Sequence, residues 1–183
     1  MNFKKFLATV VASAAILAPG AAFADEETRQ HQQLWDTLKR VGVHVVANSP
    51  NFCDGNVHGF YAPAERLLVV CQDDAKVLNG KMVPWTANDF DTLRHEAQHV
   101  VQDCSLGGLG DNRETAFISD DQQLAKFVSG ALTRNQINWI ISTYEKSGAT
   151  PHVVKLELEA FAVAATVNAA SIADAVQTTC GAR

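Results

Sequence analysis

Several stretches of the chain carry apolar residues at every third or fourth position, the spacing of a helix that buries one face. In residues 25–41 these positions are Leu34, Leu38 and Val41. A second helix is expected after Thr86, which together with Asp89 resembles a capping box. Its apolar positions are Phe90, Leu93, Ala97, Val100 and Cys104. Further helices are expected over residues 120–131, 133–147 and from Pro151 to about Gln177.

Short apolar runs between the first two predicted helices indicate strands. They cover residues 43–47, 60–61 and 67–70, while residues 81–85 fit either a strand or a loop. A small antiparallel or mixed N-terminal sheet followed by a helical C-terminal half makes the predicted fold class α+β.

The start of the chain has the pattern of an export signal. Two lysines precede an apolar run over residues 6–18, and Ala22-Phe23-Ala24 follows, so we expect cleavage after Ala24. The run is shorter than the roughly 20 residues that span a bilayer, so we expect no membrane anchor. The pattern predicts a secreted or periplasmic protein, with residues 25–183 as one domain.

Composition narrows the possible partners. The 183 residues carry a net charge of -5, and removing the signal leaves 13 basic against 20 acidic side chains. Without a basic run, the chain is not expected to bind nucleic acid or an anionic membrane. Its oligomeric state is not predicted by these features.

All four cysteines follow the predicted cleavage site, as expected for disulfides in an oxidising compartment. Four cysteines allow three pairings. We favour Cys53 with Cys71, which bracket one strand-and-turn unit, and Cys104 with Cys180, which would tie the C-terminus to the central helix.

The candidate chemistry lies on the helix after Thr86, as His95-Glu96-Ala97-Gln98-His99. Two His four positions apart lie one helical turn from each other, so both imidazoles can reach one metal ion. Glu96 points about 100° away from His95, where it can take a proton from a water on that metal. This spacing predicts a Zn²⁺ site.

A catalytic zinc needs a third protein ligand. Gln102 and Ser105 stand where the metzincin pattern requires Gly and His or Asp, so that pattern fails. The last predicted helix offers Glu157 and Glu159 within an apolar sequence. A buried acidic residue is costly unless it is paired or binds a cation, and neither has an obvious partner nearby in sequence.

With these residues the chain resembles the gluzincin group of zinc metallopeptidases, in which His-Glu-x-x-His is completed by a Glu on a later helix, often followed by Ala. The resemblance implies a zincin-like active-site helix with His95 and His99 as ligands and Glu96 as general base. It makes Glu159, followed by Ala160, the third ligand, with Glu157 as the alternative.

The resemblance covers about 70 residues and implies two further features. An edge strand that pairs with an extended peptide would correspond to Arg66–Cys71, and Asp103 would orient an imidazole. The Glu-x-x-x-Asp pattern found around the third ligand in thermolysin is absent, because position 163 is Val.

Peptide hydrolysis also needs a donor to the developing oxyanion, commonly Tyr or His in this group. His152 lies seven residues before Glu159 and Tyr144 precedes the same helix, so both are candidates. The predicted function is a secreted zinc metalloendopeptidase that acts on a peptide or protein substrate. The alternative is an inactive or non-enzymatic disulfide-linked domain with a structural zinc or a partner-binding role.

Overall fold

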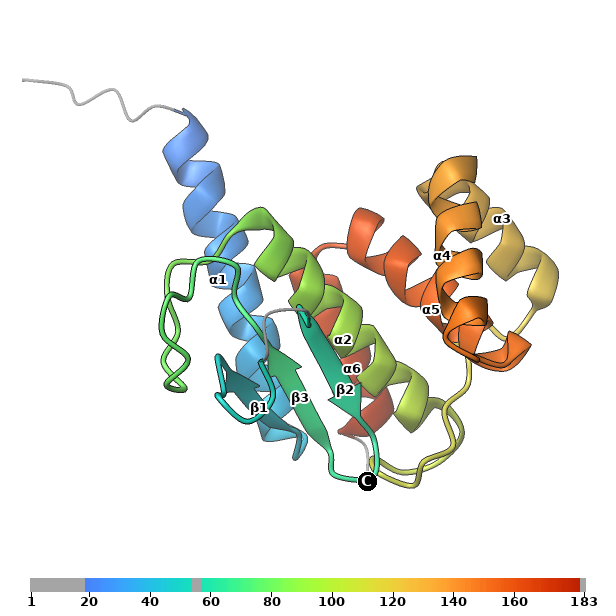
Figure 1. The fold of residues 1–183 in the computed structure, drawn as a ribbon, viewed down its shortest axis with the longest axis horizontal. Coiled ribbons are helices and arrows are strands. Elements are labelled where there is room, and N and C mark those ends of the chain that lie inside the picture. Colours follow the sequence, from blue (N-terminus) through green and yellow to red (C-terminus); the bar gives the residue numbers. More distant parts are fainter. Residues whose placement is uncertain (1–18, 54–56, 182–183) are drawn as a thin grey trace, which may run out of the picture.

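A computed structural model describes residues 19–53 and 57–181, and most of the predicted export signal, residues 1–18, lies outside them. The fold is α+β, as predicted, with a small mixed sheet and a largely helical C-terminal half (Figure 1). The described elements are α1 (Pro19–Arg40), β1 (His44–Ala47), β2 (Gly59–Ala62), β3 (Leu67–Val70), α2 (Ala87–Leu106), α3 (Asp121–Ala131), α4 (Arg134–Lys146), α5 (Pro151–Thr166) and α6 (Ala169–Cys180).

The sheet has the order β1-β3-β2, with β1 parallel and β2 antiparallel to β3. The expectation that Arg66–Cys71 is the edge strand is therefore wrong, because β3 is hydrogen-bonded on both sides. The edge strand beside α2 is β2, which reaches this place through the bend at Pro63. Residues 81–85 form a loop.

The predicted start of α2 is confirmed. The Thr86 side chain accepts from the Asp89 N–H, and the Asp89 carboxylate accepts from the Thr86 N–H. This reciprocal pair satisfies two N–H groups that a helix start leaves free. The helix ends at Gly107. Its register is set by the buried residues that the apolar pattern marked, such as Leu93 and Val100.

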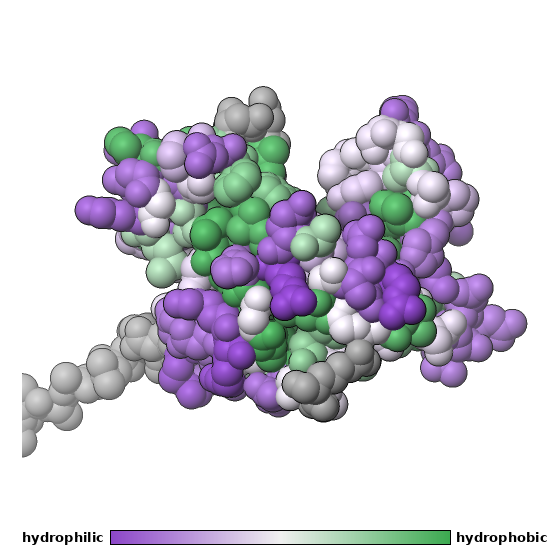
Figure 2. Space-filling model, turned by 90° about the horizontal axis from the view of Figure 1, so that it is seen from below, coloured by the Kyte–Doolittle hydropathy of each residue, from purple (hydrophilic) through white to green (hydrophobic). Residues whose placement is uncertain are grey.

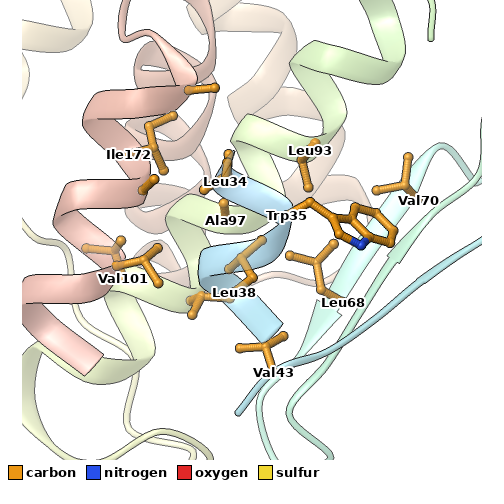
Figure 3. Packing of buried hydrophobic residues seen from close by; sticks show 14 of the residues in the cluster. Leu34, Trp35, Leu38, Val43, Leu68, Val70, Leu93, Ala97, Val101 and Ile172 are labelled. Carbon is orange, nitrogen blue, oxygen red and sulfur yellow. The ribbon is translucent and has the colours of Figure 1, made fainter. Parts of the chain in front are cut away.

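The main core lies where α1 and α2 pack on the sheet and α6 packs on these two helices (Figure 3). Leu34 and Leu38 of α1, Leu68 of β3, Leu93 of α2 and Ile172 of α6 are buried there. A second apolar cluster joins α3, α4 and α5, with Ile140 and Leu156 among its buried residues. Because α5 also packs on α2, it connects the two clusters.

The single helix expected from Pro151 to about Gln177 is wrong. Val167 has extended backbone angles, and Asn168 caps a new helix by accepting from the Ser171 N–H. Asn is a strong N-cap residue, because its side-chain oxygen replaces a missing helical acceptor. The break lets α6 turn back to pack along α1 and α2.

Both predicted disulfides are present, Cys53–Cys71 and Cys104–Cys180. The first links the loop after β1 to the end of β3, and the second links α2 to the end of α6. In the part of the chain that the structure describes, no helix combines the length and apolarity needed to cross a membrane.

Candidate metal centre

The two histidines of the motif lie one turn apart on α2 and face each other. Their Nε2 atoms are 3.2 Å apart, and both side chains are nine-tenths buried. The His95 ring packs edge-on against Phe161 of α5, with ring centroids 4.4 Å apart. The helix spacing and this packing direct both imidazoles toward α5.

Glu157 of α5 completes the cluster. Its Oε2 lies 3.2 Å from His95 Nε2, and its Oε1 lies 3.6 Å from His99 Nε2. One potential ligand atom from each of the three residues lies within 4.8 Å of the others. Two imidazoles and one carboxylate form the donor set typical of a catalytic zinc with an open position.

The structure does not bring Glu159, the expected third ligand, to the two histidines. Residues two apart on a helix point about 200° apart, so Glu157 and Glu159 cannot both face the histidines. Glu159 is fully buried and its carboxylate accepts four N–H groups. The donors and distances are Gln98 Nε2 (3.2 Å), Gln102 Nε2 (2.8 Å), Phe117 N (2.9 Å) and Ile118 N (2.7 Å).

The cluster has the properties of a cation site. Glu157 Oε2 is a buried oxygen without a hydrogen-bond partner among the described residues. Burial alone lowers the pKa of His99, but the neighbouring Glu157 raises that pKa to about 9. Burial likewise raises the pKa of Glu157, and its contacts with His95 and His99 lower it well below the usual range. The carboxylate and facing nitrogens therefore favour a positive charge between them, which fits a divalent metal.

Glu96 lies beside the two histidines, under the edge strand β2. Burial raises the pKa of Glu96, while His95, His99 and the backbone N–H of Tyr61, which donates to its carboxylate, lower it. The strand approaches closely because residue 59 is Gly: a Cβ there would lie 2.7 Å from Val69 O and 3.3 Å from Glu96 Cγ. A carboxyl with a raised pKa next to a metal site suits proton transfer.

Of the two candidate oxyanion donors, the structure brings Tyr144 to the cluster. Its ring packs against Phe161, with centroids 6.4 Å apart, and its hydroxyl faces Glu157. Burial and the Glu157 carboxylate raise the pKa of Tyr144, so the hydroxyl stays protonated. His152 is exposed and its Nε2 lies 2.9 Å from the carbonyl oxygen of Glu114.

Asp103 does not contact an imidazole, contrary to expectation. Its Oδ2 accepts from the Tyr61 hydroxyl at 2.8 Å and from the Gly110 N–H at 2.7 Å. The residue that contacts the His99 ring is Gln102, whose Oε1 lies 2.7 Å from His99 Nδ1. Asp103 thus joins β2 and the loop after α2, which contains Gly110, to α2.

Sequence reasoning did not assign roles to Gln98, Gln102 or Glu114. The two glutamines could have been noticed because they lie on the buried side of α2. A buried side-chain amide needs hydrogen-bond partners there. Glu114 lies in the loop between α2 and α3, and no pattern marks it. Burial raises the pKa of Glu114, and the nearby His99 lowers it, so this carboxyl also borders the cluster.

The cluster lies along the boundary between two parts of the molecule. Figure 2 shows the surface hollowed beside the lobe that carries α3 and α4. Since α5 packs against α2 on one side and against these two helices on the other, the residues of the site lie along this boundary. Trp139 of α4, 57% exposed, packs on Phe161 with centroids 6.3 Å apart, adding an apolar wall.

Residues 23–180 match a family described as Domain of unknown function (DUF8637). The chain belongs to this family. No curated protein and no solved structure matches it. The residues that match the DUF8637 family include all of α2 to α6. They therefore include His95, His99 and Glu157.

Proposed function

We propose that the protein is an exported zinc metallopeptidase in which His95, His99 and Glu157 hold the metal and Glu96 is the general base. The observation that carries this proposal is the convergence of the three donor side chains beside a buried glutamate with a raised pKa. Zinc, when bound, lowers the pKa of water and polarises a carbonyl group. The export signal over residues 1–24 and the two disulfides support an extracytoplasmic location.

In this proposal Glu96 takes a proton from the attacking water at its carboxylate and later passes it to the leaving amine. The raised pKa supports this role, since it makes the carboxylate a stronger base that holds the proton until the leaving amine takes it. The Tyr144 hydroxyl supplies a hydrogen bond to the developing oxyanion.

The edge strand supports an extended peptide as the substrate. The Cys71 N–H donates to the His58 carbonyl at 2.7 Å, and hydrogen-bonded pairs in an antiparallel ladder recur every second residue. The backbone groups of Gly59 and Tyr61 therefore point away from β3, and the Tyr61 N–H reaches Glu96. A substrate strand beside β2 would run past the general base.

In the gluzincin pattern the third ligand is a Glu that is often followed by Ala. The resemblance to this part of the pattern is weaker with Glu157 as ligand, because Leu158 follows it. The proposal therefore depends on the His-Glu-x-x-His helix and a later glutamate, and less on membership of the gluzincin group.

The test uses the exported protein purified without a chelator, with zinc measured by mass spectrometry and cleavage measured on a mixed peptide library. We expect one zinc per chain and cleavage in the wild type, and zinc without cleavage in Glu96→Gln. His95→Ala with unchanged zinc content and activity would show that the site is wrong.

A chelator separates the enzyme from the alternative with a structural zinc. Loss of cleavage with an unchanged circular dichroism spectrum is expected for the enzyme. Unfolding on zinc removal, with no cleavage beforehand, would favour the structural role.

A further inference from the structure

The buried amide of Gln102 connects the candidate metal centre to Glu159. Its Oε1 lies 2.7 Å from His99 Nδ1, and its Nε2 lies 3.0 Å from the Leu156 carbonyl and 2.8 Å from Glu159 Oε2. The side chain is fully buried, so these three groups provide its hydrogen bonds.

The partners fix which way round the amide lies. The Leu156 carbonyl and the Glu159 carboxylate are acceptors, so the group that faces them must be the NH2 group. The amide oxygen then faces His99 and can only accept, which requires a proton on His99 Nδ1. The lone pair of the neutral ring is consequently on Nε2, the atom that faces His95 and Glu157.

Glu159 is itself held in place. Two backbone N–H groups, those of Phe117 and Ile118, and the Gln98 side chain donate to its carboxylate in addition to Gln102. Glu159 thereby joins the loop before α3 to the buried side of α2. The His95 ring has no such support, since its Nδ1 lacks a hydrogen-bond partner in the described part of the chain.

We infer that Gln102 is a positioning residue that holds His99 with Nε2 directed at the metal, and that Glu159 anchors Gln102 for this purpose. The inference rests on the proposed zinc site. A hydrogen bond to the distal nitrogen fixes the tautomer and ring orientation of a metal-bound histidine, and its loss typically weakens metal binding about 10- to 100-fold.

Two glutamines on the same helix provide a matched pair of variants. Both Gln98 and Gln102 are buried and donate to Glu159 Oε2, but only Gln102 contacts His99. Gln98→Met and Gln102→Met each remove one donor to Glu159 and place the same unbranched side chain in α2. A general effect on packing should therefore appear in both.

The first measurement is metal binding by titration with Zn²⁺ and with Co²⁺, whose visible spectrum reports the ligand geometry. We expect Gln102→Met to raise the dissociation constant about 10- to 100-fold and to alter the Co²⁺ spectrum. The dissociation constant of Gln98→Met should lie within about threefold of the wild-type value, with an unchanged Co²⁺ spectrum, because Gln98 contacts Glu159 and not His99.

The second measurement needs neither metal nor activity. A long-range ¹H–¹⁵N spectrum of the metal-free wild type and of Gln98→Met should show a slowly exchanging proton on His99 Nδ1, and Gln102→Met should lose this protection. A fast-exchanging or unprotonated Nδ1 in the wild type would overturn the inference even if Gln102→Met did not fold.

The outcomes separate this inference from the proposed function. Equal metal affinity and identical Co²⁺ spectra in all three proteins would overturn only the role of Gln102. A wild type that binds no zinc would instead overturn the proposed function, together with the metal site that Gln102 is proposed to support.

Discussion

Replacing each acidic residue of α5 by glutamine should separate metal binding from folding. Glu157→Gln removes the charge that faces His95 and His99, and Glu159→Gln removes the charge that accepts four N–H groups. The two substitutions are chemically identical and lie two residues apart on one helix. We expect the first to lose zinc and the second to lose stability.

The stability cost of Glu159→Gln follows from its donors. Oε2 accepts three N–H groups and Oε1 accepts only that of Ile118, so the best orientation places the new NH2 group toward Ile118. One buried N–H then loses its acceptor, at about 1–3 kcal/mol. Three charge-assisted bonds become neutral, at up to about 1 kcal/mol each. The expected total is about 4 kcal/mol.

The zinc response of Glu159→Gln should nevertheless persist, because in this orientation the amide oxygen still accepts from Gln102. A ligand at 100 times its dissociation constant stabilises the protein that binds it by about 2.7 kcal/mol. Wild type and Glu159→Gln should both gain this increment, and Glu157→Gln should gain close to none.

The assay is urea unfolding followed by circular dichroism, with and without zinc. The wild type gives the size of the increment, and calcium in place of zinc controls for a general effect of divalent ions. A full zinc increment in Glu157→Gln and none in Glu159→Gln would refute the assignment of Glu157, because that result would make Glu159 the ligand.

Three further changes test other parts of the structure. Cys104→Ala with Cys180→Ala opens a loop of 76 residues, and removal of the Cys53–Cys71 disulfide opens one of 18 residues. Chain entropy predicts that the free energy of unfolding in urea falls by about 4.5 kcal/mol in the first case and by about 3.2 kcal/mol in the second. A larger fall for the shorter loop would contradict this prediction. Burial lowers the pKa of His31, which accepts from Arg94, so stability should fall as pH drops below about 6.5, by up to about 1.4 kcal/mol per pH unit, with a smaller slope in His31→Gln. Tyr144→Phe should lower kcat about 100-fold with unchanged KM and zinc content, and a change confined to KM would exclude the oxyanion role.

The sign of the His31 effect follows from its two contacts. Nε2 faces the Arg94 guanidinium, which can only donate, and Nδ1 lies 2.7 Å from the Glu27 carbonyl oxygen, which can only accept. The neutral ring with its proton on Nδ1 satisfies both. Below the pKa that His31 has in the unfolded chain, the unfolded chain binds a proton at His31 and the folded protein does not, so acid favours unfolding.

Features that depend on neighbouring residues could be predicted from the sequence. The start of α2 at Thr86, its buried face and the His95, Glu96 and His99 arrangement follow from helix periodicity within one segment. Both disulfides were also predicted, from the neighbourhood of the cysteines. The break at Asn168 was missed because the apolar pattern continues through it, although Asn is a strong cap.

Features that depend on how segments meet could not be predicted in the same way. The edge position of β2 is set by the chain reversing at Pro63 to pair with β3, and apolar runs of equal length carry no information on strand order. Gln102 was recognised only as a departure from another family's pattern. Its proposed role depends on Leu156 and Glu159, more than 50 residues away.

The two glutamates of α5 show why burial alone does not identify a metal ligand. The expectation that a buried acid needs a partner or a cation holds for both, but it is met in different ways. Glu159 has four N–H donors, two of them backbone groups of a loop that no sequence pattern marks, whereas Glu157 faces two imidazoles and has an unsatisfied oxygen. A carboxylate with all its acceptor capacity used gains little from a cation, and one with a free buried oxygen gains much. This difference supports Glu157, and not Glu159, as the proposed metal ligand, because two residues that lie two apart on a helix cannot both face the histidines.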